Sequence, residues 1–298
     1  MGRNACQSQR HDNGFDLTGR WFQNDLEVDT VPIGDRALHY GDGLFETIAV
    51  RSGRPRLLDL HLDRLELGCH RLNIDKPPIA TVPDGLQFAI KTAGFDGADC
   101  TAKIILSRGE GRRGYAPSEM TQPVLRIGIF ERTSYPVQYY RDGIIVSLSK
   151  GRLARQPQLA GIKTLNRLEQ VLAAAEHAEP GCTERLMMDT EGNLICGTMS
   201  NVFLVFGSSV LTPAITHAGI CGVMRHHLLR TADRLRIDYE AARIQPDMLQ
   251  QADEVFVTNS QIGLWPVRAC GKLRWRPGPV TRRLMAGLEQ AGIGECRL

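Results

Sequence analysis

The segment GIKTLNRLEQVL, residues 161–172, combines a helix pattern with one unusual residue. Apolar residues recur at helical spacing from Leu165 onward, and Lys163 stands just before them, next to Ile162. The chain has 6 lysines against 30 arginines, so lysine is not its usual cation. Burial among apolar residues lowers the pKa of a lysine toward the range in which its amine is a nucleophile. Lys163 is therefore a candidate for a covalent bond to a carbonyl compound, and the ordinary alternative is a lysine whose head reaches water.

The composition indicates a globular protein and excludes several functions. A chain of 298 residues with 42% hydrophobic and 23% charged residues has room for one large domain or two ordinary ones. The net charge of +3 is small and the basic residues are scattered, which argues against nucleic-acid binding. No apolar run approaches the roughly 18 residues of a membrane span, and residues 1–19 lack the apolar stretch of a secretory signal. The eight cysteines form no CxxC pair, so we expect no metal site and a cytoplasmic protein.

Hydrophobic periodicity predicts strands and helices mixed within both halves of the chain. Hairpins are predicted at 20–34 and 43–59, helices at 60–74, 82–95, 165–175, 222–235 and 280–292, and strands at 100–111, 123–130, 144–151, 185–190, 193–198, 200–207 and 254–260. The fold expected is α+β with two lobes. The predicted division is a flexible N-terminal extension (1–19), a small N-terminal domain (20–133), a linker (134–142) and a larger C-terminal domain with Lys163 (143–298).

Six motifs occur in an order that is more specific than any one of them. They are DRALHYGDGLFET (35–47), HLDRL (61–65), SRGEGRRGY (107–115), GIKTLNRLEQVL (161–172), CGTMSNVF (196–203) and GVMRHHLL (222–229). Together they resemble the fold-type IV pyridoxal-phosphate enzymes, the family of branched-chain and D-amino-acid aminotransferases. Within that family the resemblance is strongest to the 4-amino-4-deoxychorismate lyases, and it extends from Trp21 to the C-terminus.

The resemblance implies a cofactor, pyridoxal 5'-phosphate, and the residues that bind it. Lys163 would be the Schiff-base lysine, and Arg64 matches the arginine that binds the cofactor phosphate. The backbone N–H groups of Val223 and Met224 would add donors at a helix start. Ser260 stands where the family often has a threonine at the same phosphate.

The glycine-rich motif at 107–115 favours the lyase, because its substrate carries two carboxylates and this loop contains three arginines. By resemblance, Arg113 and Tyr115 are expected to face the substrate. Tyr40 and Phe45 match residues that line the substrate pocket in this family, often from the partner subunit, so a homodimer is expected. Without the other motifs, the loop would be interpreted equally well as a solvated hairpin.

One position departs from the family pattern. The segment CGTMSNVF, with Ser200 among its cofactor-binding residues, begins with Cys196 where the family usually has a glutamate paired with the pyridine nitrogen. Glu191 lies in a predicted turn and is a poor replacement. A thiol is a weak donor and a poor acceptor, so it supports a protonated ring nitrogen badly.

This departure bears on the choice among three functions. The first is the lyase, which would make 4-aminobenzoate and pyruvate in folate biosynthesis. It needs less electron withdrawal than amino transfer does, because aromatisation of its product draws charge out through the substrate ring. The second is an aminotransferase of the same fold that acts on D-amino or branched-chain amino acids. The third is a chain that binds the cofactor without catalysis, for which Cys196 is the only support.

Overall fold

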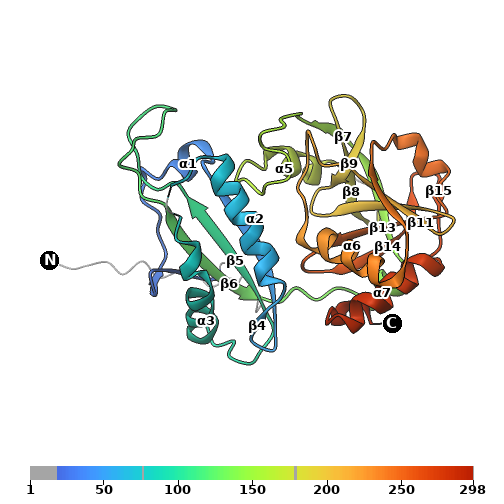
Figure 1. The fold of residues 1–298 in the computed structure, drawn as a ribbon, viewed down its shortest axis with the longest axis horizontal. Helices are drawn as coiled ribbons and strands as arrows, with labels where there is room; N and C mark the ends of the chain where they lie inside the picture. Colours follow the sequence, from blue (N-terminus) through green and yellow to red (C-terminus); the bar gives the residue numbers. More distant parts are fainter. Residues whose placement is uncertain (1–18, 76, 178–179, 298) are drawn as a thin grey trace.

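The computed structural model describes residues 19–75, 77–177 and 180–297. The N-terminal extension predicted at 1–19 therefore lies outside the described residues, except for Gly19. The described chain forms two lobes that lie side by side, each built around its own sheet (Figure 1). No helix among the described residues is long and apolar enough to cross a membrane.

The first lobe contains a six-stranded sheet in the order β2-β1-β6-β5-β3-β4. Its strands are β1 (Arg20–Gln23), β2 (Leu26–Val28), β3 (Gly43–Arg51), β4 (Arg54–Pro55), β5 (Cys100–Ser107) and β6 (Val124–Glu131). Both predicted hairpins are present, as the antiparallel pairs β1–β2 and β3–β4. Ser52 and Gly53 form the tip of the second hairpin with φ of 49° and 71°, and two positive φ values are what a tight hairpin turn requires.

Two helices cover one face of this sheet (Figure 1). They are α2 (Leu58–Arg71) and α3 (Val82–Thr92), and the short helices α1 (Arg36–Tyr40) and η1 (Ile79–Thr81) lie beside them in the chain. Buried residues of α2 and α3, such as Leu65 and Leu86, pack on the apolar side chains of β3, β5 and β6. The amphipathic pattern predicted for 60–74 therefore describes α2 correctly, and it places Arg64 on the opposite side from solvent-exposed Glu66.

The second lobe contains a nine-stranded sheet in the order β12-β11-β10-β13-β14-β7-β8-β9, with β15 paired to β14. Its strands are β7 (Ile144–Leu153), β8 (Cys182–Asp189), β9 (Leu194–Gly197), β10 (Asn201–Phe206), β11 (Ser209–Pro213), β12 (Tyr239–Ala242), β13 (Glu254–Asn259), β14 (Gly263–Cys270) and β15 (Leu273–Arg274). The sheet mixes parallel pairs, such as β7–β8, with antiparallel ones, such as β10–β13.

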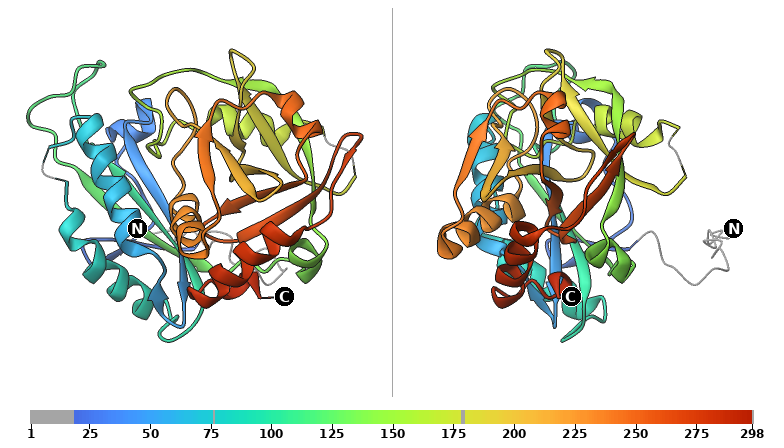
Figure 2. Two further views of the ribbon diagram at one scale, coloured as in Figure 1. Left: turned by 45° about the vertical axis from the view of Figure 1, so that its right-hand side comes forward. Right: turned by 90° about the vertical axis from the view of Figure 1, so that its right-hand side faces the viewer.

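Helices α6 (Val223–Leu235) and α7 (Pro279–Gln290) pack against each other and on this sheet (Figure 2). Their buried residues join the largest core of the chain, in which Trp265, Phe203 and Phe256 are fully buried. The short helices η2 (Pro246–Gln250) and η3 (Gly294–Cys296) complete the lobe.

The helix after Lys163 differs from the prediction. Helix α5 spans Leu168–Ala175 and begins three residues later than expected, because the chain before it pairs with other segments. Its apolar stripe also faces outward: Leu168 is 75% exposed, and Val171 and Leu172 are exposed as well. Amphipathic spacing shows that a helix has an apolar face, but not which surface covers that face.

The linker predicted at 134–142 contains one short helix, α4 (Val137–Arg141). Its Tyr140 is buried against Trp265 of the second lobe, so part of this segment packs in the core. The first sheet ends at Glu131 and the second begins at Ile144. The domain boundaries themselves stay a prediction.

Candidate active site

A cavity of about 340 Å³ lies where the two lobes meet. Its size is within the range of small-molecule and cofactor pockets. The first lobe contributes β3 and α2, and the second lobe contributes the segment around Lys163, the β9–β10 region, the start of α6 and the end of β13. Of the residues predicted for the site, the following line this cavity: Phe45, Arg64, Lys163, Cys196, Ser200, Val223 and Ser260.

Lys163 is held in the cavity by backbone pairing with the first lobe. Its carbonyl accepts a hydrogen bond of 2.9 Å from the Phe45 N–H, and the neighbouring Leu165 N–H donates to the Gly43 carbonyl at 3.0 Å. The Nζ atom lies 4.3 Å from the centroid of the Phe45 ring. Burial, with help from the positive charge of Arg64, lowers the pKa of Lys163 to about 7. A substantial fraction of this amine is therefore unprotonated and nucleophilic at neutral pH.

Arg64 is positioned by Glu46, a buried carboxylate on β3. The Nε and Nη2 atoms of Arg64 donate to Glu46, the Nε bond at 2.8 Å, and Nη1 donates to the Cys221 carbonyl at 2.9 Å. His61 places its Nδ1 2.6 Å from the same carboxylate. Burial alone would raise the pKa of Glu46, but Arg64 and His61 outweigh it and lower the pKa to about 2. A guanidinium has five N–H donors, so Arg64 keeps two for a ligand in the cavity.

The start of helix α6 lies beside Arg64. The Asn201 side chain fixes this helix start, since it accepts from the Gly222 N–H at 3.1 Å and donates to the Ile220 carbonyl at 2.9 Å. A Cβ at Gly222 would come within 2.1 Å of Asn201 Oδ1, so the close approach requires glycine. No side chain caps this helix, and the first N–H groups of a helix attract anions. The Met224 side chain is buried in the core, so only its backbone can serve the cavity.

The end of β13 supplies a hydroxyl that the sequence analysis did not assign. The Ser260 hydroxyl donates to the Thr47 carbonyl at 2.7 Å, so its proton is already committed. Thr258, by contrast, lines the cavity with a buried Oγ1 that has no hydrogen-bond partner among the described residues. A buried polar atom without a partner is costly unless a ligand or water satisfies it. Thr258 therefore joins Ser260 as a hydroxyl residue at this end of the cavity.

Cys196 lies at a second polar part of the cavity, with Arg167 and Gln170. Burial raises the pKa of the Cys196 thiol to about 12, so the thiol stays neutral near pH 7. Nε of Arg167 and Oε1 of Gln170 are buried without a hydrogen-bond partner among the described residues. The cavity thus contains unsatisfied polar atoms on several walls, which indicates a polar ligand that contacts more than one of them.

The Ser200 hydroxyl is held from behind the cavity by Glu184 on β8. Ser200 Oγ donates to Glu184 Oε2 at 2.7 Å, and the Thr198 N–H donates to Oε1 of the same carboxylate at 3.0 Å. With its proton engaged, the Ser200 hydroxyl can only accept a hydrogen bond from a ligand. Glu184 thereby fixes the segment that follows Cys196.

Comparison with known proteins matches the chain to one family. The model for the amino-transferase class IV family matches residues 43–270, more than half of the chain. The chain belongs to this family. The aminodeoxychorismate lyase of Vibrio harveyi is 34% identical over 90% of this chain and 99% of that protein. The probable branched-chain-amino-acid aminotransferase of Thermotoga maritima is 31% identical over 83% of this chain and 85% of its own length.

A solved structure extends the comparison to the fold. The crystal structure of 4-amino-4-deoxychorismate lyase from Pseudomonas aeruginosa matches with a TM-score of 0.86 and 40% identity, over 92% of this chain and 99% of that one. The predicted α+β fold of the class IV family, with its two lobes, is confirmed.

Three predicted residues of this class IV family member lie away from the cavity that contains Lys163. Tyr40 lines a neighbouring cavity, of about 620 Å³, next to α5. Arg113 is exposed and Tyr115 is 86% exposed, in the loop between β5 and β6 that extends beyond the first lobe (Figure 1). Arg36 holds this loop through hydrogen bonds to the Gly114 and Tyr115 carbonyls at 2.9 and 2.7 Å.

Among the residues that the sequence analysis did not assign to the site are Arg167, Gln170 and Thr258, which line the cavity, and Glu46, which holds Arg64. Glu46, Arg167 and Gln170 stand inside motifs that were quoted for other residues, and Thr258 lies in the strand predicted at 254–260. Glu46 and Thr258 are on strands predicted correctly, so alternation could have shown that they share a face with apolar neighbours. A charged or hydroxyl residue on the buried face of a predicted strand is therefore the sequence feature that could have identified these site residues.

Proposed function

We propose that this chain is a pyridoxal-phosphate-dependent lyase that converts 4-amino-4-deoxychorismate to 4-aminobenzoate and pyruvate in folate biosynthesis. The observation that carries the proposal is the match, over nearly the full length of both chains, to two proteins named as this lyase. The test is to supply aminodeoxychorismate and follow the release of 4-aminobenzoate and pyruvate, with D-alanine or leucine plus 2-oxoglutarate as the rival reaction. Faster amino transfer than pyruvate release would contradict the proposal.

The residues of the cavity fit pyridoxal phosphate. Arg64 and the start of α6 offer positive charge and N–H donors for a phosphate, and Thr258 offers an unpartnered hydroxyl. Lys163 offers an amine with a lowered pKa for the covalent attachment. When bound, pyridoxal phosphate supplies a ring that withdraws electrons from the carbon that bears the substrate's amino group.

Lys163 Nζ is the group that moves protons. With pyridoxal phosphate bound, Nζ would take the proton from the substrate ring carbon that bears the amino group, and it would then protonate the departing enolpyruvyl group. A pKa of about 7 suits both steps, since each protonation state is populated near neutral pH. Loss of the enolpyruvyl group makes the substrate ring aromatic, so the reaction places a smaller demand on electron withdrawal.

The neutral thiol of Cys196 is consistent with that smaller demand, and its replacement tests the assignment. A Cys196→Glu variant places a carboxylate near Arg167, and we expect it to raise the pKa of the cofactor's ring nitrogen. The measurement is a pH titration of the visible spectrum of the cofactor-loaded protein, with Cys196→Gln as a control of equal size. The same titration curve for both variants would show that Cys196 does not contact the ring.

We further propose that the protein acts as a homodimer in which Arg113 serves the partner's cavity. Arg113 and Tyr115 are on the loop between β5 and β6, which extends from the first lobe on the side away from the second lobe (Figure 1), and neither residue lines the cavity that contains Lys163. The exposed apolar residues of α5, Leu168, Val171 and Leu172, offer a surface for a second copy.

Mixing two defective variants tests this arrangement. Arg113→Ala should raise KM for aminodeoxychorismate, because a carboxylate partner is lost, while the cofactor stays bound. Lys163→Ala should be inactive. Subunits mixed after mild dissociation should regain activity, since about a quarter of the sites then combine an intact lysine with an intact arginine. Absence of recovery, with dimers shown by sedimentation, would place Arg113 at its own chain's site or at none.

An aminotransferase of the same fold is the second candidate. It is favoured by the 31% identity to the Thermotoga maritima protein named as a probable branched-chain-amino-acid aminotransferase. The assay with rival amino donors separates the two candidates directly.

A further inference from the structure

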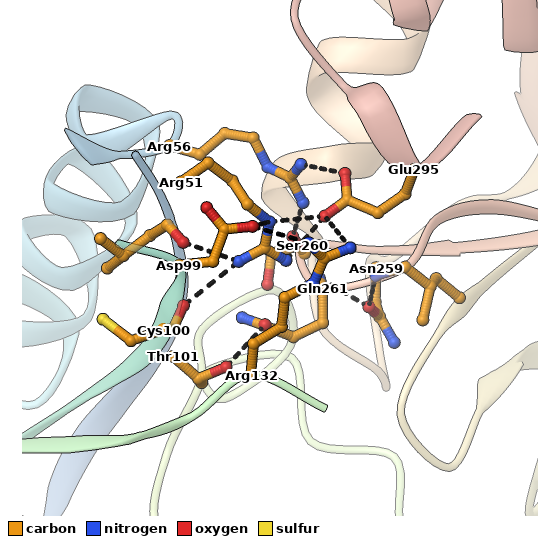
Figure 3. A network of polar contacts seen from close by, with 12 residues as sticks. Arg51, Arg56, Asp99, Cys100, Thr101, Arg132, Asn259, Ser260, Gln261 and Glu295 are labelled. Carbon is orange, nitrogen blue, oxygen red and sulfur yellow. Dashed lines mark hydrogen bonds and ion pairs between the residues drawn. The ribbon is translucent and has the colours of Figure 1, made fainter. Parts of the chain in front are cut away.

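An ion-pair cluster joins η3 to Arg51 and Arg56 of the first lobe (Figure 3). Glu295 lies in η3, and its side chain is 5% exposed. Its carboxylate lies 2.6 Å from Nη2 of Arg51 and 2.5 Å from Nη1 of Arg56. Arg132, which follows β6, lies at 3.9 Å. A carboxylate that is deeply buried and paired with two arginines indicates a specific positional role.

Arg56 continues this contact to the wall of the cavity. Its Nη2 donates to the Ser260 carbonyl at 2.5 Å, while Nη1 is paired with Glu295. One planar guanidinium thus connects the C-terminal turn to the loop that follows β13 (Figure 3). The same loop is attached to the first lobe by the Ser260 hydroxyl on Thr47 and by a 3.1 Å hydrogen bond between Thr101 and Gln261.

The loop that Arg56 holds belongs to the anion-binding end of the cavity. Thr258, Asn259, Ser260 and Gln261 all line the cavity, and Thr258 contributes its unpartnered hydroxyl. We propose that Glu295 is a positioning residue for this end: it fixes Arg56, and Arg56 fixes the 258–261 segment, the end of β13 and the loop after it, where the cofactor phosphate would bind. The inference rests on the cofactor proposed above. It deepens that proposal by assigning a role to a residue that does not line the cavity.

A purely electrostatic role and a positioning role for this carboxylate predict opposite changes in phosphate affinity when it is removed. Burial tends to raise the pKa of Glu295, but Arg56 and Arg51 outweigh it and hold the pKa below its ordinary value, so the group is an anion. If Glu295 acted only through its charge, its loss would strengthen the binding of a phosphate dianion. If it acts by holding Arg56 in place, its loss should weaken that binding.

The experiment compares pyridoxal phosphate with pyridoxal, which lacks the phosphate. For each variant, the ratio of the two Kd values, measured by absorbance titration of the apoprotein, reports on the phosphate end alone. We expect Glu295→Gln to lower the preference for pyridoxal phosphate about tenfold, the usual effect of losing one charge-assisted hydrogen bond. The control is Glu289→Gln, which removes the same charge from a solvent-exposed pair with Arg297 at 3.6 Å and should change nothing.

A second variant tests the connection through Arg56. Lysine cannot span Glu295 and the Ser260 carbonyl with one fork, so Arg56→Lys should cause a similar loss. The double variant should lose no more of the preference for pyridoxal phosphate than either single variant does, because both changes break the same connection. If the losses of preference for pyridoxal phosphate in the two single variants added up in the double variant, Glu295 would not act through Arg56.

The outcomes also separate this inference from the proposed function. An unchanged or increased preference for pyridoxal phosphate in Glu295→Gln would overturn the positioning role and leave the cofactor assignment intact. The Glu295→Gln apoprotein could instead have lower thermal stability and an unchanged ratio of the two Kd values. That result would show a structural role only, and it would overturn the inference too. A wild-type chain with no preference for pyridoxal phosphate over pyridoxal would overturn both.

Discussion

Lys163→Ala should abolish turnover, with a loss of at least ~10³-fold, because it removes both the covalent attachment and the proton-transferring amine. The variant should also lose the visible absorbance that arises when a lysine amine bonds to pyridoxal phosphate. That readout does not depend on which substrate the protein uses, so it tests the site separately from the reaction.

Lys103→Ala is the matched control for this prediction. Lys103 lies on β5, and its Nζ is 5.4 Å from the centroid of the same Phe45 ring. Loss of this second amine should leave the absorbance in place. An active or coloured Lys163→Ala variant would assign the covalent bond to another lysine.

The lowered pKa of Lys163 adds a pH dependence. The uncharged amine is the nucleophile, and its fraction falls as the pH drops below about 7. The rate at which the apoprotein takes up pyridoxal phosphate should therefore decrease from pH 8 to pH 6. A flat profile across this range would mean that the amine keeps an ordinary pKa.

Arg64→Ala should release the cofactor, with a loss of about 1.5–3 kcal/mol in binding for a contact between charged groups. The substitution also removes the guanidinium from the buried Glu46 carboxylate and leaves it with His61, and breaking a buried ion pair costs about 3–5 kcal/mol of stability. A single variant would confuse these two effects.

The double variant Arg64→Ala/Glu46→Gln separates them. With the carboxylate neutralised, thermal stability should largely return, while the Kd for pyridoxal phosphate should stay high. The Kd for pyridoxal should differ little from that of the wild type, because Arg64 is assigned to the phosphate, which pyridoxal lacks. A loss of equal size for both compounds would place Arg64 elsewhere on the cofactor.

Much of the fold could be predicted from the sequence. The Ser52-Gly53 turn, the strands on either side of it and the amphipathic helix α2 all follow from local chemistry. The order of the six motifs also indicated the family that the comparison then showed. These features are local or are written in linear order, so one sequence contains them.

The orientation of exposed segments could not be predicted in this way. The apolar residues of α5 have the spacing of a core helix, yet Leu168 and Leu172 face outward. The loop with Arg113 was assigned to the substrate, and only the fold shows that Arg113 does not line the cavity of its own chain. Spacing predicts that two residues share a face, whereas the partner of that face depends on the whole chain.

The sequence by itself determined most of the helices and strands, the family, and the lysine on which the proposed chemistry depends. The tertiary structure decided which polar atoms are available around that lysine. The Ser260 hydroxyl donates its proton to the Thr47 carbonyl, whereas the Thr258 hydroxyl has no hydrogen-bond partner among the described residues. Glu295 reaches the same loop from the end of the chain. Which polar atoms are free to bind a ligand depends on contacts between residues far apart in the chain, and Arg51 and Glu295 are 244 positions apart. No local sequence pattern shows such contacts.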